Sequence, residues 1–461
     1  MKGILGKRAN LDLTEGSVFK TIVTFAIPLF LSNVFQQLYN TMDTIIIGHT
    51  LGDTALAAMG SATAIYDLII GFALGVGNGL TIVTARSFGC RDEKQLKKSV
   101  ASSLVIGIVL SVLITVLARF ILYPFLQVLH TPEEIIEDAY AYISTIMLFV
   151  IVMFAYNLLS GILRAVGNSV MPLIFLMVSS ILNIGLDILL IVGFDMGIRG
   201  AAVATVISQA VSVVLCVIYI IRKTKWLIPA KEHFAADADL YKEMIAQGLS
   251  MGFMNCIVNA GTAILQSGIN NLGYLVIAGH TAARKLFSFL SMPFLAMSQT
   301  MSTYVSQNYG AGKRERIRSG MKCAYLSGVV MSVAVTVLML FLAPAMVRLL
   351  SGSSEAVVLE NGALYLRVVA PSLMILEILI CTRSALQAIG AKILPVLSSV
   401  IELVGKILFV ILFIPRYQYL AVVFCEPVIW CFMVVELVLS FWRNPFIRGK
   451  KNRSEVREDG E

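Results

Sequence analysis

Long apolar stretches, separated by short polar ones, recur along the whole chain. A run of about 20 apolar residues is enough to cross a bilayer as a helix. Twelve such windows occur, near residues 17–47, 54–84, 99–123, 136–160, 169–192, 200–221, 245–271, 275–305, 323–349, 358–381, 395–414 and 420–441. The longest of them must tilt, bend or protrude from the bilayer. The pattern predicts an all-α membrane protein with twelve transmembrane helices.

The composition agrees with this pattern and excludes an ordinary soluble domain. The 461 residues are 58% hydrophobic and only 14% charged, whereas soluble domains are about 25% charged. Of the 36 lysines and arginines, 27 fall in tails and loops on the side of the N-terminus, and only Arg199, Arg348 and Arg416 fall in the opposite loops. Both termini are therefore expected in the cytoplasm. This asymmetry explains the net charge of +8, so we expect a lipid bilayer and no nucleic acid as partner.

The first apolar window carries a polar stripe that ends at Asp43. A carboxylate at bilayer depth costs about 2.5 to 3.5 kcal/mol, so it should face a polar cavity rather than lipid. Tyr39 and Gln36 precede Asp43 by four and seven residues and share its helix face, with Asn40 close beside them. Pro28 removes a backbone donor earlier in the same helix, which makes it the expected hinge. The stripe predicts that Asp43 is the working residue of a transporter.

A second intramembrane carboxylate, Asp187, lies in the fifth window. Asn183 precedes it by four residues on the same face, and the sixth window adds Thr205 and Ser208 beside small residues that allow close packing. Two carboxylates, an amide and hydroxyls from three helices would form an all-oxygen site for a proton or for sodium, which would make Asp43 and Asp187 metal ligands in the second case. Two carboxylates in a low dielectric do not both ionise cheaply, so the pair should accept a proton or a cation.

The chain also repeats itself at a spacing of about 221 to 223 residues. Gly89 matches Gly310, Gly167 matches Gly390 and Pro172 matches Pro395. Each repeat holds six windows, an even number, so the two are parallel repeats that form two lobes around a central cleft. The expected parts are an N-terminal tail (1–16), a first lobe (17–221), a cytoplasmic linker (222–244), a second lobe (245–442) and a basic C-terminal tail (443–461). Within the second window, Gly71, Gly75 and Gly79 form a smooth strip where another helix can approach.

The second lobe lacks the acid pair at the equivalent positions but holds other charges. Glu402 and Lys406 lie four residues apart and favour a mutual ion pair, and Arg284 could meet the acids of this lobe. Glu377 is its best candidate for contact with substrate or ion. The further residues that could line a substrate-tolerant cleft are polar: Asn40, Asn255, Asn259, Gln266 and Gln299.

Other chemistry finds little support in the sequence. The seven cysteines are scattered, and the four histidines (His49, His130, His233 and His280) show no metal spacing. No phosphate-binding loop follows a strand, so an ion gradient is expected to supply the energy. No catalytic set of side chains is recognisable, which disfavours a membrane enzyme such as a prenyl transferase. A flippase for a lipid-linked oligosaccharide remains the alternative, although it would need a strongly cationic cavity.

Several motifs together resemble the multidrug and toxic compound extrusion family. They are QQLYNTMDTIIIG, GILRAVGNSVMP, ILNIGLD with GIRGAAVATVISQ, and SFLSMPFLAMSQTMSTYVSQNYGAGKRER. The resemblance implies a multi-pass antiporter of the cell membrane that exports organic, often cationic compounds against inward proton or sodium flow, without a further cofactor. We expect a monomer.

Within that family, the DNA-damage-inducible branch has its ion site in the first lobe. Its pattern maps onto Gln36, Tyr39, Asp43, Asn183, Asp187 and Thr205. A branch with acids in the seventh and tenth helices fits less well. The resemblance leaves open the identity of the substrates and the choice between proton and sodium.

Overall fold

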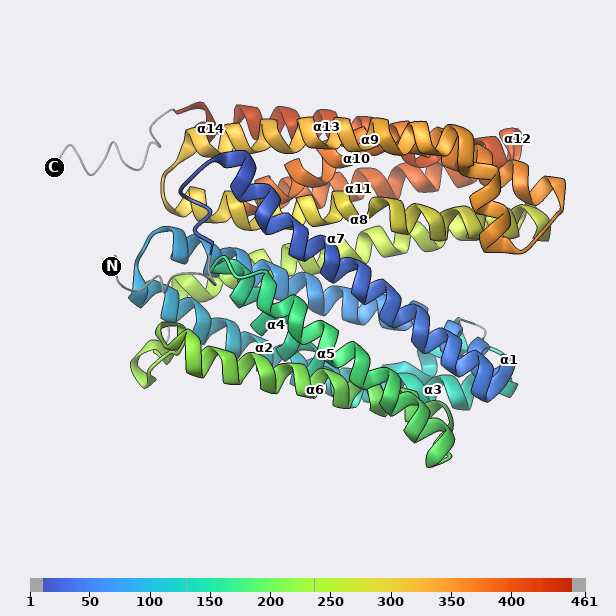
Figure 1. Ribbon diagram of the computed structural model, residues 1–461, viewed down its shortest axis with the longest axis horizontal. Helices are drawn as coiled ribbons and strands as arrows, with labels where there is room; N and C mark the ends of the chain where they lie inside the picture. The colour runs from blue at the N-terminus through green and yellow to red at the C-terminus, as the bar shows by residue number, and fades with distance from the viewer. Residues whose placement is uncertain (1–10, 130, 236, 450–461) are drawn as a thin grey trace. The chain divides into compact units, whose positions relative to one another are not determined.

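The structure, a computed structural model, describes residues 11–129, 131–235 and 237–449 (Figure 1). All regular secondary structure within these ranges is helical. The ends of the two predicted tails, residues 1–10 and 450–461, lie outside the described residues, and so does His130.

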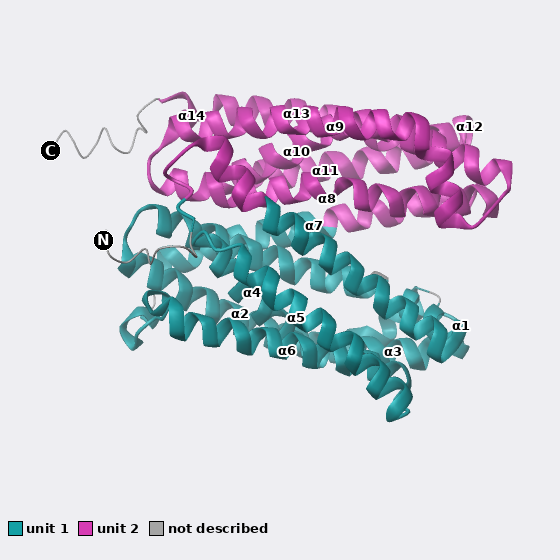
Figure 2. Ribbon diagram, in the orientation of Figure 1, with its two compact units in different colours: residues 1–12, 27–256 teal, residues 13–26, 257–461 magenta. Residues whose placement is uncertain are grey.

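The chain folds into two compact units, shown in different colours in Figure 2. Unit 1 comprises residues 1–12 and 27–256, and unit 2 comprises residues 13–26 and 257–461. These divisions fall within two long helices, α1 (Val18–Gly89) and α7 (Ala238–Asn270), rather than at the ends of the predicted lobes. The sequence boundaries follow polarity, which marks where the chain leaves the bilayer. The units instead reflect which residues pack together. Each of these two long helices begins in one unit and ends in the other.

The remaining helices of unit 1 follow α1 along the chain. They are α2 (Glu93–Val128), α3 (Glu133–Leu148), α4 (Val150–Ala165), α5 (Val170–Asp187), a π-helical segment η1 (Ile188–Gly193), α6 (Gly197–Lys223) and the 3-10 turns η2 (Lys225–Leu227) and η3 (Lys231–Phe234). Helix α1 contains the first two predicted windows, and its backbone departs from helical angles at Gly52, where φ is 81°. Asp92 caps α2 by accepting a hydrogen bond from the backbone N–H of Gln95 at 3.1 Å.

Unit 2 follows the same plan after the second part of α7. Its helices are α8 (Tyr274–Gly310), α9 (Arg314–Ser351), α10 (Ala356–Ala388), α11 (Ile393–Leu408), the π-helical η4 (Phe409–Phe413), α12 (Ile414–Tyr417), α13 (Tyr419–Arg443) and α14 (Pro445–Arg448).

The predicted hinge residue, Pro28, keeps helical backbone angles within α1, so in this conformation the hinge stays a prediction.

Each of the twelve predicted windows coincides with a helical segment. By length and hydropathy, ten helices of the described residues can cross a membrane, or eleven when α3 and α4, bent by 51°, count as one span. The window at 275–305 corresponds to α8, which is not among these ten helices and which carries Arg284 and Lys285. The prediction of an all-helical membrane protein is confirmed.

The internal repeat is visible in the backbone as well as in the sequence. Helices α5 and α11 begin 223 residues apart, at Val170 and Ile393, and each continues into a π-helical segment. The glycines before them, Gly167 and Gly390, have φ values of 89° and 93°. A single offset therefore relates the fifth helices of both repeats, residue by residue.

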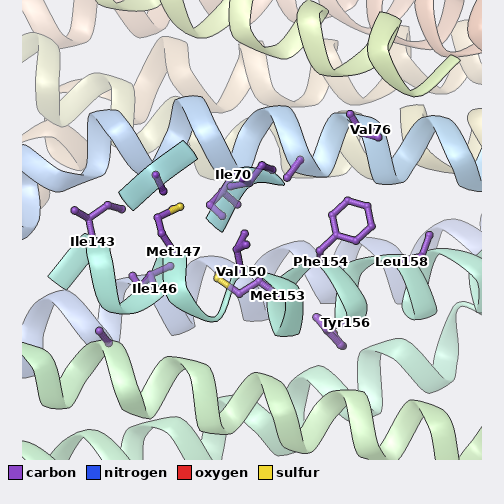
Figure 3. Packing of buried hydrophobic residues seen from close by; sticks show 14 of the residues in the cluster. Ile70, Val76, Ile143, Ile146, Met147, Val150, Met153, Phe154, Tyr156 and Leu158 are labelled. Carbon is purple, nitrogen blue, oxygen red and sulfur yellow. The ribbon is translucent and has the colours of Figure 1, made fainter. Parts of the chain in front are cut away.

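Buried apolar side chains of α1, α3 and α4 pack together in the core of unit 1 (Figure 3). Val150, Phe154 and Leu158 follow one another at four-residue spacing and are each at most 4% exposed, because this spacing keeps them on one helix face. A Cβ added at Gly107 of α2 would lie 2.6 Å from the Phe154 ring. The glycine therefore lets α2 approach the core side of α4.

The predicted glycine strip of α1 is confirmed within unit 1. A Cβ added at Gly79 would lie 2.6 Å from the Cα of Gly248, and one at Gly75 would lie 2.6 Å from the carbonyl oxygen of Met251. The carbonyl of Gly71 accepts a hydrogen bond from the Asn255 amide at 2.9 Å. The strip thus places the first part of α7 directly against the backbone of α1.

Candidate functional site

Two helices of unit 1 each present a polar pair at four-residue spacing. Helix α1 supplies Tyr39 and Asp43, and α5 supplies Asn183 and Asp187. Since residues four apart lie on the same helix face, each pair faces in one direction. Asn183 and Asp187 are 0% and 1% exposed, whereas Asp43 is half-buried. The structure therefore brings the two predicted carboxylates together on the inside of unit 1.

The amide of Asn183 bridges the two carboxylates. With its nitrogen turned toward them, Nδ2 lies 2.7 Å from Asp43 Oδ1 and 3.3 Å from Asp187 Oδ2. The two carboxyl groups therefore share this one amide as a common neighbour. The other oxygen of Asp187 is buried and has no hydrogen-bond partner among the described residues.

Helix α6 adds neutral oxygens to this cluster. The Tyr39 hydroxyl donates to Thr205 Oγ1 at 3.1 Å, and Tyr39 lies one helix turn before Asp43 on the same face. Ser208 donates to the backbone carbonyl of Thr205 instead of facing the carboxylates. Ala201, Ala202 and Ala204 of the same helix are buried, and these small side chains allow the close packing that brings Thr205 to the site. We call Tyr39, Asp43, Asn183, Asp187 and Thr205 the acid-pair cluster.

Gln36 and Asn40 lie outside the acid-pair cluster. The Gln36 amide donates to Asn40 Oδ1 at 3.3 Å, and Asn40 is exposed. Helix spacing correctly placed these residues on the polar stripe, but it could not show that their side-chain amides are hydrogen-bonded to each other.

The other residues predicted for a substrate cleft have varied surroundings. Gln266 donates to Asn270 at 2.9 Å, Gln299 is exposed, and Asn259 is half-buried. Asn255 holds α7 to α1 through Gly71. Glu377 is 0% exposed between α9 and α10, where it accepts a hydrogen bond from the Cys381 thiol at 3.1 Å. In this conformation Glu377 is therefore closed to any ligand, and the cleft itself stays a prediction.

The acid-pair cluster has the chemistry of a small-cation site. Two like charges about 4 Å apart repel by about 4 kcal/mol at an effective dielectric constant of about 20, so the pair gains by taking up a positive ion. With Nδ2 of Asn183 facing the carboxylates, the amide offers a donor and no oxygen, so this orientation suits a proton rather than a metal ion. With the amide turned by 180°, its oxygen and those of both carboxylates would converge, as sodium requires. The unpartnered oxygen of Asp187 fits either ion.

The described residues hold no group of three or more His, Cys, Asp or Glu side chains that would bind a transition metal. The acid-pair cluster, with two carboxylates and neutral oxygens, therefore suits a hard monovalent cation better than a softer metal.

Unit 2 contains a network of buried charges that the sequence indicated only in part. The predicted pair is confirmed, because Lys406 Nζ lies 2.9 Å from Glu402 Oε1. Arg284 donates to both oxygens of Glu426, at 3.1 and 2.9 Å, and to the Tyr365 hydroxyl at 3.1 Å. The sequence showed no sign of Tyr365 as a partner, because its contacts join helices about 60 to 80 positions apart. We call Arg284, Tyr365, Glu402, Lys406 and Glu426 the charge network.

One family model, MatE, matches the chain twice, over residues 28–189 and again over residues 250–412. Among curated proteins, the chain is 30% identical over 308 residues to the "Probable multidrug resistance protein YpnP" of Bacillus subtilis (strain 168), which covers 66% of this chain and 68% of that protein. It is 23% identical over 394 residues to the "Multidrug export protein MepA" of Staphylococcus saprophyticus, covering 84% and 86% of the two chains.

Solved structures share the fold along nearly the whole chain. A structure described as "MATE in the bent conformation" superposes with a TM-score of 0.86 at 22% identity, covering 96% of this chain and 99% of that one. An "Outward-facing conformation of a multidrug resistance MATE family transporter of the MOP superfamily" gives a TM-score of 0.85 at 22% identity, covering 95% and 98%.

Proposed function

Because the chain belongs to the MatE family, we propose that it is a secondary active exporter, which moves organic, often cationic and amphipathic compounds out of the cell in exchange for protons or sodium ions. Members of this family are transporters and not enzymes, and the chain is a multi-pass membrane protein. The names of its relatives, a multidrug resistance protein and a multidrug export protein, support the class of substrate.

The observation that carries this proposal is the acid-pair cluster. Intramembrane carboxylates are costly, and here two of them within unit 1 face the same amide. A structural role alone would be served as well by neutral hydrogen-bonding residues. The cost is explained if the pair must accept and release an ion during each transport cycle.

The mechanism that follows is a switch between a loaded and an unloaded acid pair. When a proton or sodium is bound, Asp43 and Asp187 stay together and hold α1 against α5. When the ion leaves, the two carboxylates repel each other, and this repulsion favours a movement of α1 away from α5. The ion can therefore shift the balance between the conformations of alternating access, because it binds only one of them well.

Pro28 is the proposed hinge for this movement of α1. It lies 15 residues before Asp43, and the division between the two units falls beside it, after Ala26. Its missing N–H removes one helix hydrogen bond and makes bending there cheaper than elsewhere in the helix. Replacing Pro28 with Ala should slow turnover more than it weakens substrate binding. An unchanged turnover number would exclude the hinge.

The residues of the cluster favour the DNA-damage-inducible branch of the family. That branch is expected to use Gln36, Tyr39, Asp43, Asn183, Asp187 and Thr205, and five of these side chains form the acid-pair cluster. Gln36 is hydrogen-bonded elsewhere in this conformation. We infer that Gln36 orients Asn40 on the exposed side of the stripe, while the other five bind the ion.

The test is ion-driven flux in proteoliposomes that contain the purified protein. A fluorescent organic cation is followed under a pH gradient and, separately, under a sodium gradient. The wild type should respond to at least one gradient, and Asp43→Asn should reduce the response to that of protein-free vesicles. Asp53→Asn, a change of the same kind on α1 outside the cluster, is the matched control. Full transport by Asp43→Asn would refute the proposed coupling site.

A further inference from the structure

The repeat assigns a counterpart in unit 2 to each position of the acid-pair cluster. At the offset of 223 that relates α5 to α11, Asn183 corresponds to Lys406. The double match of the family model, which ends at residues 189 and 412, has the same offset. A neutral amide in one unit is thus replaced by an ammonium group in the other.

Lys406 bridges two carboxylates, as Asn183 does in unit 1. Its Nζ lies 2.9 Å from Glu402 Oε1 and 3.8 Å from Glu426 Oε1, and it donates to Thr262 Oγ1 at 3.3 Å. The side chain is 2% exposed. The three contacts come from α11, α13 and α7, the fifth, sixth and first long helices of the second repeat. In unit 1 the acid-pair cluster is built from the same three positions, α5, α6 and α1.

The carboxylates around Lys406 are held in place by other cations. Arg284 and the Tyr365 hydroxyl fix Glu426, the latter at 3.2 Å. Arg383 Nη2 lies 3.8 Å from Glu402 Oε2. The Arg383 side chain is 11% exposed, and its Nε and Nη2 have no hydrogen-bond partner among the described residues. The two glutamates are therefore held in place by groups other than Lys406, and the Lys406 ammonium lies between them.

We propose that the two glutamates form a second monovalent-cation site whose cation, the Lys406 ammonium, is covalently attached. The comparison rests on the proposed ion site in unit 1, where the cation is free to leave. In unit 2 the ammonium is tethered by its own side chain, so no ion is exchanged there. Ion coupling is then confined to the acid-pair cluster, with one exchangeable carboxylate pair in each chain.

A site of this kind should accept a free cation once the tether is removed. Lys406→Ala leaves Glu402 and Glu426 facing a space of the size of the lost propylammonium group, because alanine keeps Cβ. The unfolding temperature of the purified variant in detergent should fall by roughly 5 to 10 °C, because two buried carboxylates lose a compensating charge. Ethylammonium, added at tens of millimolar, should restore more than half of this loss, since it supplies the same N–H donors.

Three controls separate this explanation from general salt effects. Tetramethylammonium has the same charge without N–H donors and should not restore stability. Lys406→Met fills the space with an unbranched apolar chain, so it should be destabilised and insensitive to ethylammonium. The wild type should not respond either. Equal responses of Lys406→Ala and Lys406→Met to ethylammonium, or none in Lys406→Ala, would overturn the proposal.

A second variant covers the case in which Lys406→Ala does not accumulate in the membrane. The double variant Lys406→Ala with Glu402→Gln removes one carboxylate together with the ammonium, so it needs no added cation. Recovery of folded double variant, but not of the single one, supports the proposal, and equal loss of both overturns it. These readouts measure folding without transport, so their failure leaves the proposed function of the acid-pair cluster to its own flux test.

Discussion

The acid-pair cluster of unit 1 and the charge network of unit 2 each contain two neighbouring carboxylates, and they place different groups between them. In both, the fifth long helix of the repeat supplies one carboxylate, while the second comes from α1 in unit 1 and from α13 in unit 2. Unit 1 places the neutral amide of Asn183 between them, 2.7 Å from Asp43. Unit 2 places the ammonium of Lys406 there, 2.9 Å from Glu402. The first arrangement still lacks a positive charge, and the second does not.

Under the proposed mechanism, the same repeated arrangement of helices serves an exchangeable cation in unit 1 and a permanent one in unit 2. A cation that must be exchanged has to bind well enough to enter and weakly enough to leave. A tethered ammonium satisfies the carboxylates permanently, and the surrounding Arg284 and Tyr365 add further hydrogen bonds. We infer that unit 2 is the less variable partner during transport, while unit 1 responds to the ion.

The largest expected effect comes from transplanting the built-in cation into unit 1. Asn183→Lys should place an ammonium between Asp43 and Asp187 and satisfy both without any free ion. We expect ion-driven flux in proteoliposomes to fall at least about 100-fold, while the unfolding temperature stays the same or rises, because a buried pair gains its compensating charge.

Asn183→Met is the matched control for size without charge. It should also impair transport, but its unfolding temperature should fall because the carboxylates lose their amide donor. If Asn183→Lys keeps ion-driven flux near the wild-type rate, the two clusters are not equivalent, and the comparison between the units fails.

Much of this arrangement could be predicted from the sequence because it depends on periodicity. The apolar windows indicated the helices, and the offset of 223 indicated the repeat. Four-residue spacing put Tyr39 with Asp43 and Asn183 with Asp187, and the structure brings these pairs together. A carboxylate in an apolar helix is costly unless it faces polar groups. The acids of α1 and α5 therefore each predicted a polar partner on another helix.

The rest could not be predicted because it depends on how each helix is rotated and where it bends. The sequence marks Glu377 as an intramembrane acid but does not reveal that it faces Gly328 of α9, where a Cβ would lie 2.2 Å from its Cγ. The junction of the first two windows at Gly52 and the division of α1 and α7 between the units are likewise results of packing. Arg284 was expected to meet an acid, but only the structure identified Glu426.

A second, smaller effect tests how closely unit 1 is packed at the glycine strip. At the offset of 221, Gly75 and Gly79 correspond to Ala296 and Thr300 of unit 2, so only unit 1 uses glycines at these positions. Gly79→Ala would bring its Cβ to 2.6 Å from the Cα of Gly248, and backbone cannot move aside as a flexible side chain can. We expect unfolding to become easier by about 1 to 3 kcal/mol, measured by thermal or denaturant unfolding.

Gly60→Ala is the control on the same helix, since a Cβ at this position meets nothing within 4 Å. It should leave stability unchanged or raise it by up to about 1 kcal/mol, because alanine favours helix over glycine. If both substitutions have the same effect, close approach between the backbones of α1 and α7 is not what the glycines provide.

The smallest effect concerns the turn that precedes the sixth helix of each repeat. Asp195 and Gln418, again 223 residues apart, are exposed and have φ values of 51° and 48°. Aspartate tolerates positive φ better than glutamine, and the ψ of −130° at Gln418 makes its conformation one that glycine adopts most easily. Gln418→Gly should therefore stabilise the protein by roughly 1 kcal/mol, after allowing for the greater freedom of glycine in the unfolded chain.

Asp195→Gly should change the unfolding free energy by less than about 0.5 kcal/mol, because its strain relief is smaller and the same entropic cost opposes it. Paired unfolding measurements decide the matter, and a larger gain at Asp195 than at Gln418 would show that the two turns store strain differently from what their backbone angles indicate.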